Sequence, residues 1–398
     1  MTLRGWLRSD GRKGIRNTIA VVYLVECAHH VAREIALPFR DRDVHVIGFP
    51  GCYPNAYAER MLHQLCTHPN VGAVVLVSLG CESFDKRALA EAVRASGRPL
   101  RLITIQKSGG TRASIAEGRE FVAAQRALLD AVPPVPMAVG ELIVGTICGG
   151  SDGTSGLTGN PAAGRAFDRL VAEGAACIFE ETGELIGCEH IMAGRAVTPA
   201  LAGELEHSVA KAARYYATLG YGSFAAGNAA GGLTTIEEKS MGAYAKSGAS
   251  PIAGLLKPGD VPPQGGLYLL DVVPDGEVRF GFPNINDNAE IAELIACGCH
   301  AVIFVTGLGS VVGSAISPVV KVCANPETWR RMADDMDVDA GRILEGRATL
   351  DEVGGEIHDL ILAVGAGARS RSEELGHQEF ILTYKSFEPI GPACLPGR

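Results

Sequence analysis

The stretch Val71-Gly-Ala-Val-Val-Leu-Val-Ser-Leu-Gly-Cys81 decides the fold of the first third of the chain. Its apolar, β-branched run is typical of a strand buried on both faces, and it ends in a glycine turn. Similar runs occupy residues 18–24, 44–48 and 100–105. Helical patterns alternate with them at residues 27–38, 56–67, 84–96 and 113–131. Strands alternating with helices predict a parallel sheet that is covered by helices on both faces.

The same alternation resumes after a proline-rich stretch, residues 132–139 (VPPVPMAV), which we interpret as a linker. Beyond it we expect strands at residues 141–147, 176–180, 266–272 and 301–306, helices at 162–173 and 200–219, and a mostly helical region from about residue 327. The fold class is therefore α/β, with two Rossmann-like parallel-sheet domains, residues 1–131 and 140–398. Ligands of such folds bind in a crevice at the carboxyl ends of the strands, so we expect the active site there.

The bulk composition excludes several classes of partner. A net charge of −9 argues against nucleic acid, and no apolar run reaches the ~20 residues of a membrane helix. The N-terminal segment is polar and lacks the apolar core of a signal peptide. Eleven cysteines without an export signal favour metal or thiol chemistry over disulfides. We therefore expect a cytoplasmic protein.

Three cysteines share one position in the predicted fold. Cys52, Cys81 and Cys148 each lie just beyond the carboxyl end of an expected strand. Three thiolates that met there would suit Fe²⁺, or alternatively an iron–sulfur cluster. The alternative is that they are small residues packed in tight strand–turn corners. Their spacing matches no compact zinc motif.

Glycine-rich loops follow several of the expected strands. They begin at Ser108, Cys148, Gly227 and Thr306, and they mix glycine with Ser, Thr, Asn and Asp. Exposed backbone N–H groups in such loops bind carboxylate or phosphate oxygens. None is a dinucleotide fingerprint or a P-loop, and tight turns remain the alternative for each. Together they predict a pocket for a small anionic substrate.

Charged side chains gather in two further loops. Glu237, Glu238 and Lys239 follow a glycine turn, and the segment Glu180-Glu-Thr-Gly-Glu184 precedes Glu189 and His190. A lysine or histidine beside carboxylates is suited to acid–base catalysis. A solvated helix start is the alternative, because glutamates favour first turns.

Several long motifs identify a family. The segment 5–17 (GWLRSDGRKGIRN) resembles the start of the main domain of the altronate/galactarate dehydratase family. Further resemblance lies in 67–72 (THPNVG), 79–82 (LGCE), 109–112 (GGTR), 148–152 (CGGSD) with 155–158 (SGLT), 189–190 (EH), and 227–240 (GNAAGGLTTIEEKS). These motifs extend over nearly the whole chain.

The resemblance implies an iron-dependent lyase that acts on a sugar acid or a related hydroxy acid. It also implies a small, β-rich, SAF-like domain that carries histidines. The chain begins at the main domain, so we expect that small domain to be a separate subunit, within a higher oligomer of the heterodimer. This arrangement is similar to the two-subunit sulfolactate sulfo-lyases and to some two-subunit altronate dehydratases.

Two departures from the sugar-acid pattern bear on the substrate. Tyr53 follows the first cysteine, where the sugar-acid enzymes tend to carry glycine, with a histidine upstream. Leu308 follows the late Thr-Gly, where they tend to carry arginine. Both changes favour a short substrate such as (2R)-3-sulfolactate, which would yield pyruvate and sulfite. A sugar-acid dehydratase that forms a 2-keto-3-deoxy acid is the alternative.

The motifs also suggest roles for individual residues. Candidate metal ligands are Cys52, Cys81, Cys148, Asp152 and Glu82. Candidate acid–base residues are Lys239 and Glu238, followed by His190 and Glu189. Candidate substrate-binding residues are Arg12, Arg16, Asn17, Arg112, Ser151, Asn228 and Thr234.

Two other classes of function are weighed against the lyase. A nucleotide-binding oxidoreductase would require a GxGxxG motif after the first long strand, where Leu24-Val-Glu-Cys27 stands instead. A non-catalytic partner of a small catalytic subunit would not need so many polar loops at strand ends.

Overall fold

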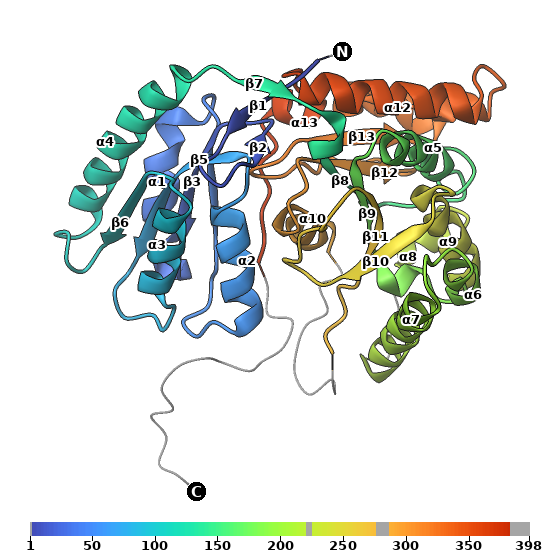
Figure 1. Ribbon diagram of the computed structural model, residues 1–398, viewed down its shortest axis with the longest axis horizontal. Helices are drawn as coiled ribbons and strands as arrows, with labels where there is room; N and C mark the ends of the chain where they lie inside the picture. The colour runs from blue at the N-terminus through green and yellow to red at the C-terminus, as the bar shows by residue number, and fades with distance from the viewer. Residues whose placement is uncertain (1, 220–224, 276–285, 383–398) are drawn as a thin grey trace, which may run out of the picture.

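The computed structural model describes residues 2–219, 225–275 and 286–382. Two parallel sheets with their covering helices lie side by side (Figure 1). The predicted α/β class is therefore confirmed.

The first sheet has four parallel strands in the order β4 (Val44–Gly48), β3 (Thr18–Tyr23), β5 (Val71–Ser78) and β6 (Leu100–Thr104). Helices α1 (Glu26–Ala36) and α4 (Thr111–Asp130) cover one face, and α2 (Ala56–Cys66) and α3 (Lys86–Ala95) cover the other. All four predicted strands and all four predicted helices of this half form, with boundaries within two residues of those expected. Every residue of β5 is buried, as its unbroken apolar run predicts.

The second sheet has seven parallel strands. Their order is β10 (Ile252–Leu256), β11 (Gly266–Leu270), β9 (Ala176–Phe179), β8 (Ile143–Cys148), β12 (Ala301–Thr306), β13 (Val319–Cys323) and β14 (Val338–Asp339). Helices α5 (Gly159–Ala172) and α12 (Leu350–Gly365) pack on one face, and α10 (Asp287–Ala296) packs on the other. The other helices are α6 (Glu189–Ala193), α7 (Pro199–Leu219), α8 (Ala226–Ala230), α9 (Ile236–Tyr244), α11 (Pro326–Met332) and α13 (Arg371–Leu375).

A third, antiparallel sheet was not expected from the sequence. It joins β2 (Lys13–Gly14), β1 (Leu3–Leu7) and β7 (Val135–Met137). The proline-rich stretch therefore contains a strand, whose residue Pro136 lies opposite Arg4. Because β7 is an edge strand, it tolerates prolines that would break the middle of a sheet.

The two large sheets share one apolar core through helices α2 and α10. Leu62 of α2 and Leu294 of α10 belong to the same buried cluster. The Tyr57 hydroxyl donates a 2.6 Å hydrogen bond to Glu293 Oε1 across this contact. The two parallel sheets thus pack into one body.

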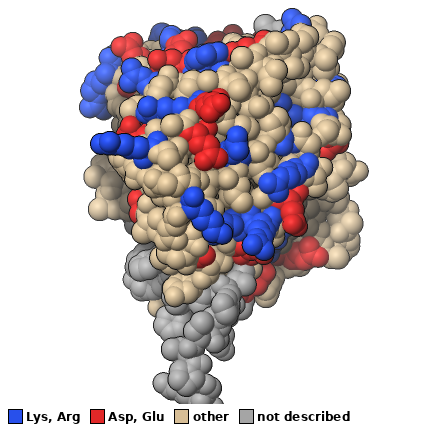
Figure 2. All heavy atoms as spheres, turned by 90° about the vertical axis from the view of Figure 1, so that its left-hand side faces the viewer, with Lys and Arg blue, Asp and Glu red and all other residues tan. Residues whose placement is uncertain are grey.

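On the face drawn in Figure 2, basic and acidic side chains are interspersed, so neither charge dominates this surface. Ion pairs such as Arg42–Asp130 and Arg101–Glu117 tie α4 to its neighbours. Within the described ranges, no helix has both the length and the apolar character needed to cross a membrane.

Candidate active site

A buried cluster of charged groups lies at the carboxyl ends of β8 and β9. These strands are parallel neighbours, with Thr146 opposite Phe179, so the residues that follow them meet at one edge of the sheet. The Cys148 thiol lies 3.2 Å from Glu181 Oε2 and 3.8 Å from Glu184 Oε2. All three residues are buried, and their donor atoms lie within 4.8 Å of one another.

Glu181 adopts an unusual backbone conformation. Its φ of 85° and ψ of 54° are left-handed, a region that residues other than glycine rarely occupy. Its carboxylate also accepts a 3.3 Å hydrogen bond from the Cys148 backbone N–H. Strained backbone of this kind concentrates at functional sites.

Two lysines reach the cluster from the other side. Lys239 in α9 and Lys246 in the following 3₁₀ turn, Ala245–Ser247, are seven residues apart, which is two helical turns. Both therefore project toward the sheet edge. Lys239 forms an ion pair with Glu184. Lys246 forms one with Glu181 and lies 3.5 Å from Cys148 Sγ.

Helix α10 adds further acidic groups. Burial raises the pKa of Asp287 to about 6, and the charge of Glu184 contributes to the rise. Burial, Glu180 and Asp287 raise the pKa of Glu290 well above its ordinary value. The oxygens of Glu180, Glu181 and Glu290 form a second compact group.

The balance of charge in this cluster favours a bound cation. Four buried glutamates (Glu180, Glu181, Glu184 and Glu290) face two buried lysines, Lys239 and Lys246. Carboxylates that lie close together in a buried site repel one another, so an additional cation would stabilise them. A thiolate with two carboxylates is a donor set that suits a divalent transition metal. The residues therefore fit a metal of the kind that the resemblance implies.

The Cys148 thiol is held in a mixed electrostatic environment. Burial raises its pKa, whereas the charge of Lys246 opposes that rise. A thiolate here depends on a nearby cation, because desolvation disfavours the charged form.

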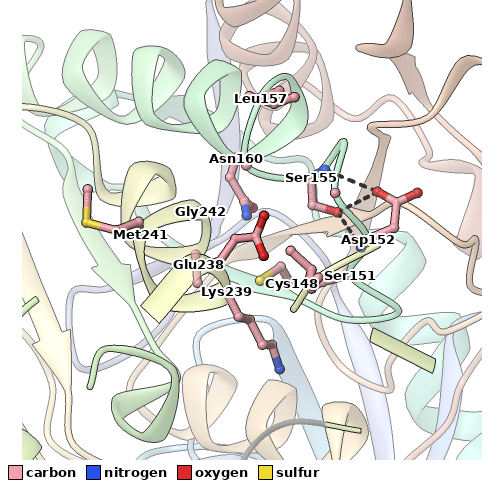
Figure 3. A pocket seen from close by; sticks show the side chains of 14 residues that line it. Cys148, Ser151, Asp152, Ser155, Leu157, Asn160, Glu238, Lys239, Met241 and Gly242 are labelled. Carbon is pink, nitrogen blue, oxygen red and sulfur yellow. Dashed lines mark hydrogen bonds between the residues drawn. The ribbon is translucent and has the colours of Figure 1, made fainter. Parts of the chain in front are cut away.

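A pocket of about 370 Å³ opens beside this cluster (Figure 3). Its walls come from the loop after β8, from α5 and from α9. The polar lining residues are Cys148, Ser151, Asp152, Ser155, Asn160, Glu238 and Lys239. The Asn160 side chain points into the pocket, and in the described part of the chain its buried Oδ1 has no hydrogen-bond partner. Exposed Leu157 and Met241 form part of its wall.

Several residues proposed from the sequence lie in or beside this pocket. Asn228 donates a 2.9 Å hydrogen bond to the Ser151 carbonyl and so braces the loop after β8. Thr234 is a hydrogen-bond partner of Glu238. Hydrogen bonds from Thr234 lower the pKa of Glu238, whose carboxylate lies at the exposed N-terminus of α9. Glu238 therefore fits the alternative interpretation of the sequence, in which it is a solvated glutamate at the start of a helix. Lys239, in contrast, reaches the buried cluster.

Asp152 lines the pocket, but its carboxylate has structural partners. It accepts hydrogen bonds from the Thr154 and Ser155 backbone N–H groups and from Asn325 Nδ2. A Cβ on Gly307 would collide with this carboxylate, so a glycine is required there.

The expected convergence of three cysteines is not found. Cys52 and Cys81 are exposed in loops of the first sheet, whereas Cys148 is buried at the second. Their sulfurs are not all within 4.8 Å of one another, and neither Cys52 nor Cys81 joins a described group of three potential ligands. The physical reason is that the three strands belong to two separate sheets.

Glu82 has a local structural role instead of joining Cys148. It accepts hydrogen bonds from Ser78 and the Gly80 N–H and forms a 3.2 Å ion pair with Lys86. Burial would raise the pKa of Glu82, but these hydrogen bonds outweigh burial and lower it.

Three of the proposed substrate-binding residues are occupied by structural contacts. Arg16 forms an ion pair with Glu373 and donates to the carbonyls of Ile15, Val364 and Ala368. The Asn17 side chain is bonded to Arg8 and the Leu129 carbonyl. Arg12 is bonded to Asp10 and the Thr67 carbonyl. These contacts fasten the N-terminal segment.

The other three predicted residues lie away from the pocket lining. Arg112 is exposed in the first turn of α4. His190 is exposed and Glu189 is half-buried in α6, and neither lines the pocket.

Sequence reasoning singled out Glu181 and Glu184 as a charged segment but did not assign them to the site. The signal was their position directly after a strand that neighbours β8. Sequence reasoning missed Lys246. Its spacing of seven residues from Lys239 was the signal that could have identified it. Sequence reasoning also missed Asp287, the first residue of the largely apolar helix α10.

Two family models match most of the chain. Residues 5–129 match the model of the D-galactarate dehydratase/altronate hydrolase second domain. Residues 139–387 match that of the D-galactarate/altronate dehydratase C-terminal domain. The boundary between the two matches falls in the stretch that contains β7.

Characterised relatives extend over most of the chain. The (2R)-sulfolactate sulfo-lyase subunit beta of Chromohalobacter salexigens is 33% identical, covering 96% of this chain and 97% of that protein. The altronate dehydratase of Bacillus subtilis is 29% identical, covering 96% of this chain and 77% of that protein. The galactarate dehydratase (L-threo-forming) of Escherichia coli is 29% identical, covering 92% and 73%. The chain is therefore a lyase that belongs to the D-galactarate/altronate dehydratase family.

Proposed function

We propose that this chain is the large catalytic subunit of a metal-dependent lyase that cleaves (2R)-3-sulfolactate into pyruvate and sulfite. The proposal rests on the buried group of Cys148, Glu181 and Glu184, which lies beside a small polar pocket. The similarity to a sulfolactate sulfo-lyase subunit along 97% of that subunit's length supports the choice of substrate.

The metal is proposed to be Fe²⁺, with an iron–sulfur cluster as the alternative. Cys148, Glu181 and Glu184 would hold it. When bound, it would act as a Lewis acid toward the substrate carboxylate and 2-hydroxyl, which lowers the cost of removing the neighbouring carbon-bound proton. One thiolate and two carboxylates suit a single ion better than a cluster, which generally requires several thiolates.

The chain's own residues supply the other elements of the reaction. Lys239 lines the pocket beside Glu184, so we assign its neutral amine form as the acceptor of the C2 proton. Loss of that proton and cleavage of the C3–S bond release sulfite and leave an enol, which becomes pyruvate. Ser151, Ser155 and Asn160 line the pocket, and we propose that they hold substrate oxygens. The raised pKa of Asp287 suits a group that holds a proton close to the cluster.

An altronate-type dehydratase is the second candidate. Similarity to the altronate dehydratases at 29% identity favours it. The same proton abstraction would then expel water from C3 in place of sulfite. Tyr53 does not discriminate between the two, because it is exposed in a loop of the first sheet and does not line the pocket. Leu308 is not among the residues that line the pocket either, but it lies next to Gly150 and Gly227, so we propose that it affects substrate length only through these loops.

We also propose a separate partner subunit, small, rich in β-structure and carrying histidines. The relative from Chromohalobacter salexigens is itself named a beta subunit, which supports a second chain. The pocket mouth carries exposed Leu157 and Met241, side chains that a covering subunit would remove from water.

The test is an anaerobic assay of this chain, co-expressed with the candidate small subunit and supplied with Fe²⁺, on 3-sulfolactate and on altronate. We expect sulfite and pyruvate from the first and no turnover of the second. The reverse result assigns the sugar-acid reaction. Full activity of the complex after Lys239→Met would show that this chain is a non-catalytic partner of the small subunit.

A further inference from the structure

Lys246 is a charged residue that no motif singled out. Its side chain is fully buried, which is rare for a lysine. It forms an ion pair with Glu181, and its Nζ lies 3.5 Å from Cys148 Sγ. Unlike Lys239, it does not line the pocket. Its ammonium therefore faces the ligand group and not the substrate.

The groups that Lys246 contacts are two of the three proposed metal ligands. An ammonium that donates to the Glu181 carboxylate uses the lone pairs that would bind a metal. It also places a positive charge next to the metal position, and like charges repel strongly in a buried site. A metal ion and Lys246 thus compete for the same two donors.

We propose that Lys246 is a built-in counter-ion that neutralises the site in the metal-free protein and must be displaced when the metal binds. The proposal rests on the metal site proposed above. Without Lys246, the metal-free protein would bury the Glu181 carboxylate without its ammonium partner, which is strongly destabilising. With it, the empty site stays folded but binds metal less tightly.

The structure also offers the ammonium a second position. The oxygens of Glu180 and Glu290 lie within 4.8 Å of those of Glu181. Glu181 belongs both to this group and to the group with Cys148 and Glu184. A short movement of the Lys246 side chain would therefore take its ammonium away from Cys148 and toward Glu180 and Glu290. The displaced charge would then remain paired inside the protein.

The test is a titration of metal-free protein with Co²⁺ under anaerobic conditions, monitored by the cobalt–thiolate absorption that reports ligation by Cys148. We expect Lys246→Met to bind Co²⁺ about tenfold more tightly than the wild type, because a competing charge has been removed. The metal-free variant should melt at a lower temperature, and Co²⁺ should raise its Tm by more than it raises that of the wild type.

Lys321→Met is the matched control. Lys321 is equally buried, but it lies on β13 with His377 Nδ1 3.4 Å from its Nζ and is not in the cluster. This variant should also melt earlier, yet its Co²⁺ affinity should stay within about twofold of the wild type. Lys246→Gln, which keeps a hydrogen-bond donor without the charge, replaces the methionine variant if that variant does not fold.

Equal or weaker Co²⁺ binding by the folded Lys246 variant, with the thiolate band present in the wild type, would overturn the counter-ion role and leave the metal site intact. Absence of the thiolate band in the wild type would overturn the metal site itself, and the counter-ion role with it.

Discussion

The strand ends of the two parallel sheets contain similar residues but differ in their surroundings. In the first sheet, Cys52 and Cys81 lie in loops after β4 and β5, exposed to solvent. In the second, Cys148 ends β8 and is buried against Glu181, Glu184 and Lys246. Both sheets place cysteine at the edge where α/β enzymes bind ligands. Only the second surrounds it with charge.

This difference shows that a cysteine at a strand end is not sufficient to make a site. Cys148 acquires partners because the neighbouring strand β9 is followed by several glutamates and because α9 delivers lysines to the same edge. In the first sheet the acidic residue beside Cys81, Glu82, is bonded to its own loop and to Lys86. The chemistry thus depends on what neighbouring strands and helices bring to the edge.

The largest expected effect comes from the buried cysteine. Cys148→Ser should lower metal content and reduce kcat by at least about 100-fold, since a hydroxyl is a poor substitute for a thiolate ligand. Metal analysis and steady-state kinetics of the complex measure this. Cys177→Ser, at a buried thiol on β9 outside the cluster, is the control and should retain metal. Full metal content in the Cys148 variant would rule out ligation by this thiol.

The next effect concerns Arg16, which the sequence assigned to substrate and the structure assigns to packing. Arg16→Ala should reduce the free energy of unfolding by about 3 kcal/mol, because it removes the ion-pair partner of Glu373 and the donor to several carbonyls. Denaturant unfolding measures this. Arg12→Ala, which removes a more exposed pair with Asp10, should cost less than about 1 kcal/mol. A large rise in KM with unchanged stability would restore the substrate-binding role.

A smaller, pH-dependent effect is expected at Asp287. Its pKa is raised from 3.8 to about 6, so its ionised form destabilises the folded protein above pH 6 and costs nothing below about pH 4. Asp287→Asn should therefore stabilise the metal-free protein by about 1 to 2 kcal/mol at pH 8, and by progressively less as the pH falls from about 6 to about 4. Thermal unfolding at several pH values follows this.

Asp275 provides the opposite case for the same measurement. Burial would raise its pKa, but hydrogen bonds from Lys211 and Lys257 lower it to about 2. Its ionised form stabilises the fold, so Asp275→Asn should lower the Tm at neutral pH and have little effect below about pH 2. The same sign of effect for both aspartates would contradict these environments.

The smallest effects are expected at the exposed cysteines. Cys52→Ser and Cys81→Ser should each change metal affinity and kcat by less than about twofold, because surface substitutions away from partners are nearly neutral. Metal titration and kinetics of the complex test this. Loss of metal in either variant would show that the two sheets share one centre, as the sequence predicts.

The sequence predicts the sheets better than the contents of the site. Strand β5 is one apolar run and helices α1 to α4 have clear periodicity, so local patterns are sufficient there. The antiparallel pairing of β1 with β7 joins residues more than a hundred positions apart, which local patterns do not encode. Lys239 and the loop after β8 were located by motif. Glu181, Glu184 and Lys246 were not assigned, because their role depends on which strands are neighbours.

The contacts that Arg16 makes with distant residues affect the order in which the protein folds during synthesis. The four strands of the first sheet all lie within residues 18–104, so this sheet can assemble early in synthesis. Arg16 must wait for Val364, Ala368 and Glu373, which are synthesised more than 340 residues later. The segment around Arg16 thus reaches its final partners long after the first sheet has been made. A bulky tag fused before Leu3 would lie at the point where the nascent protein closes.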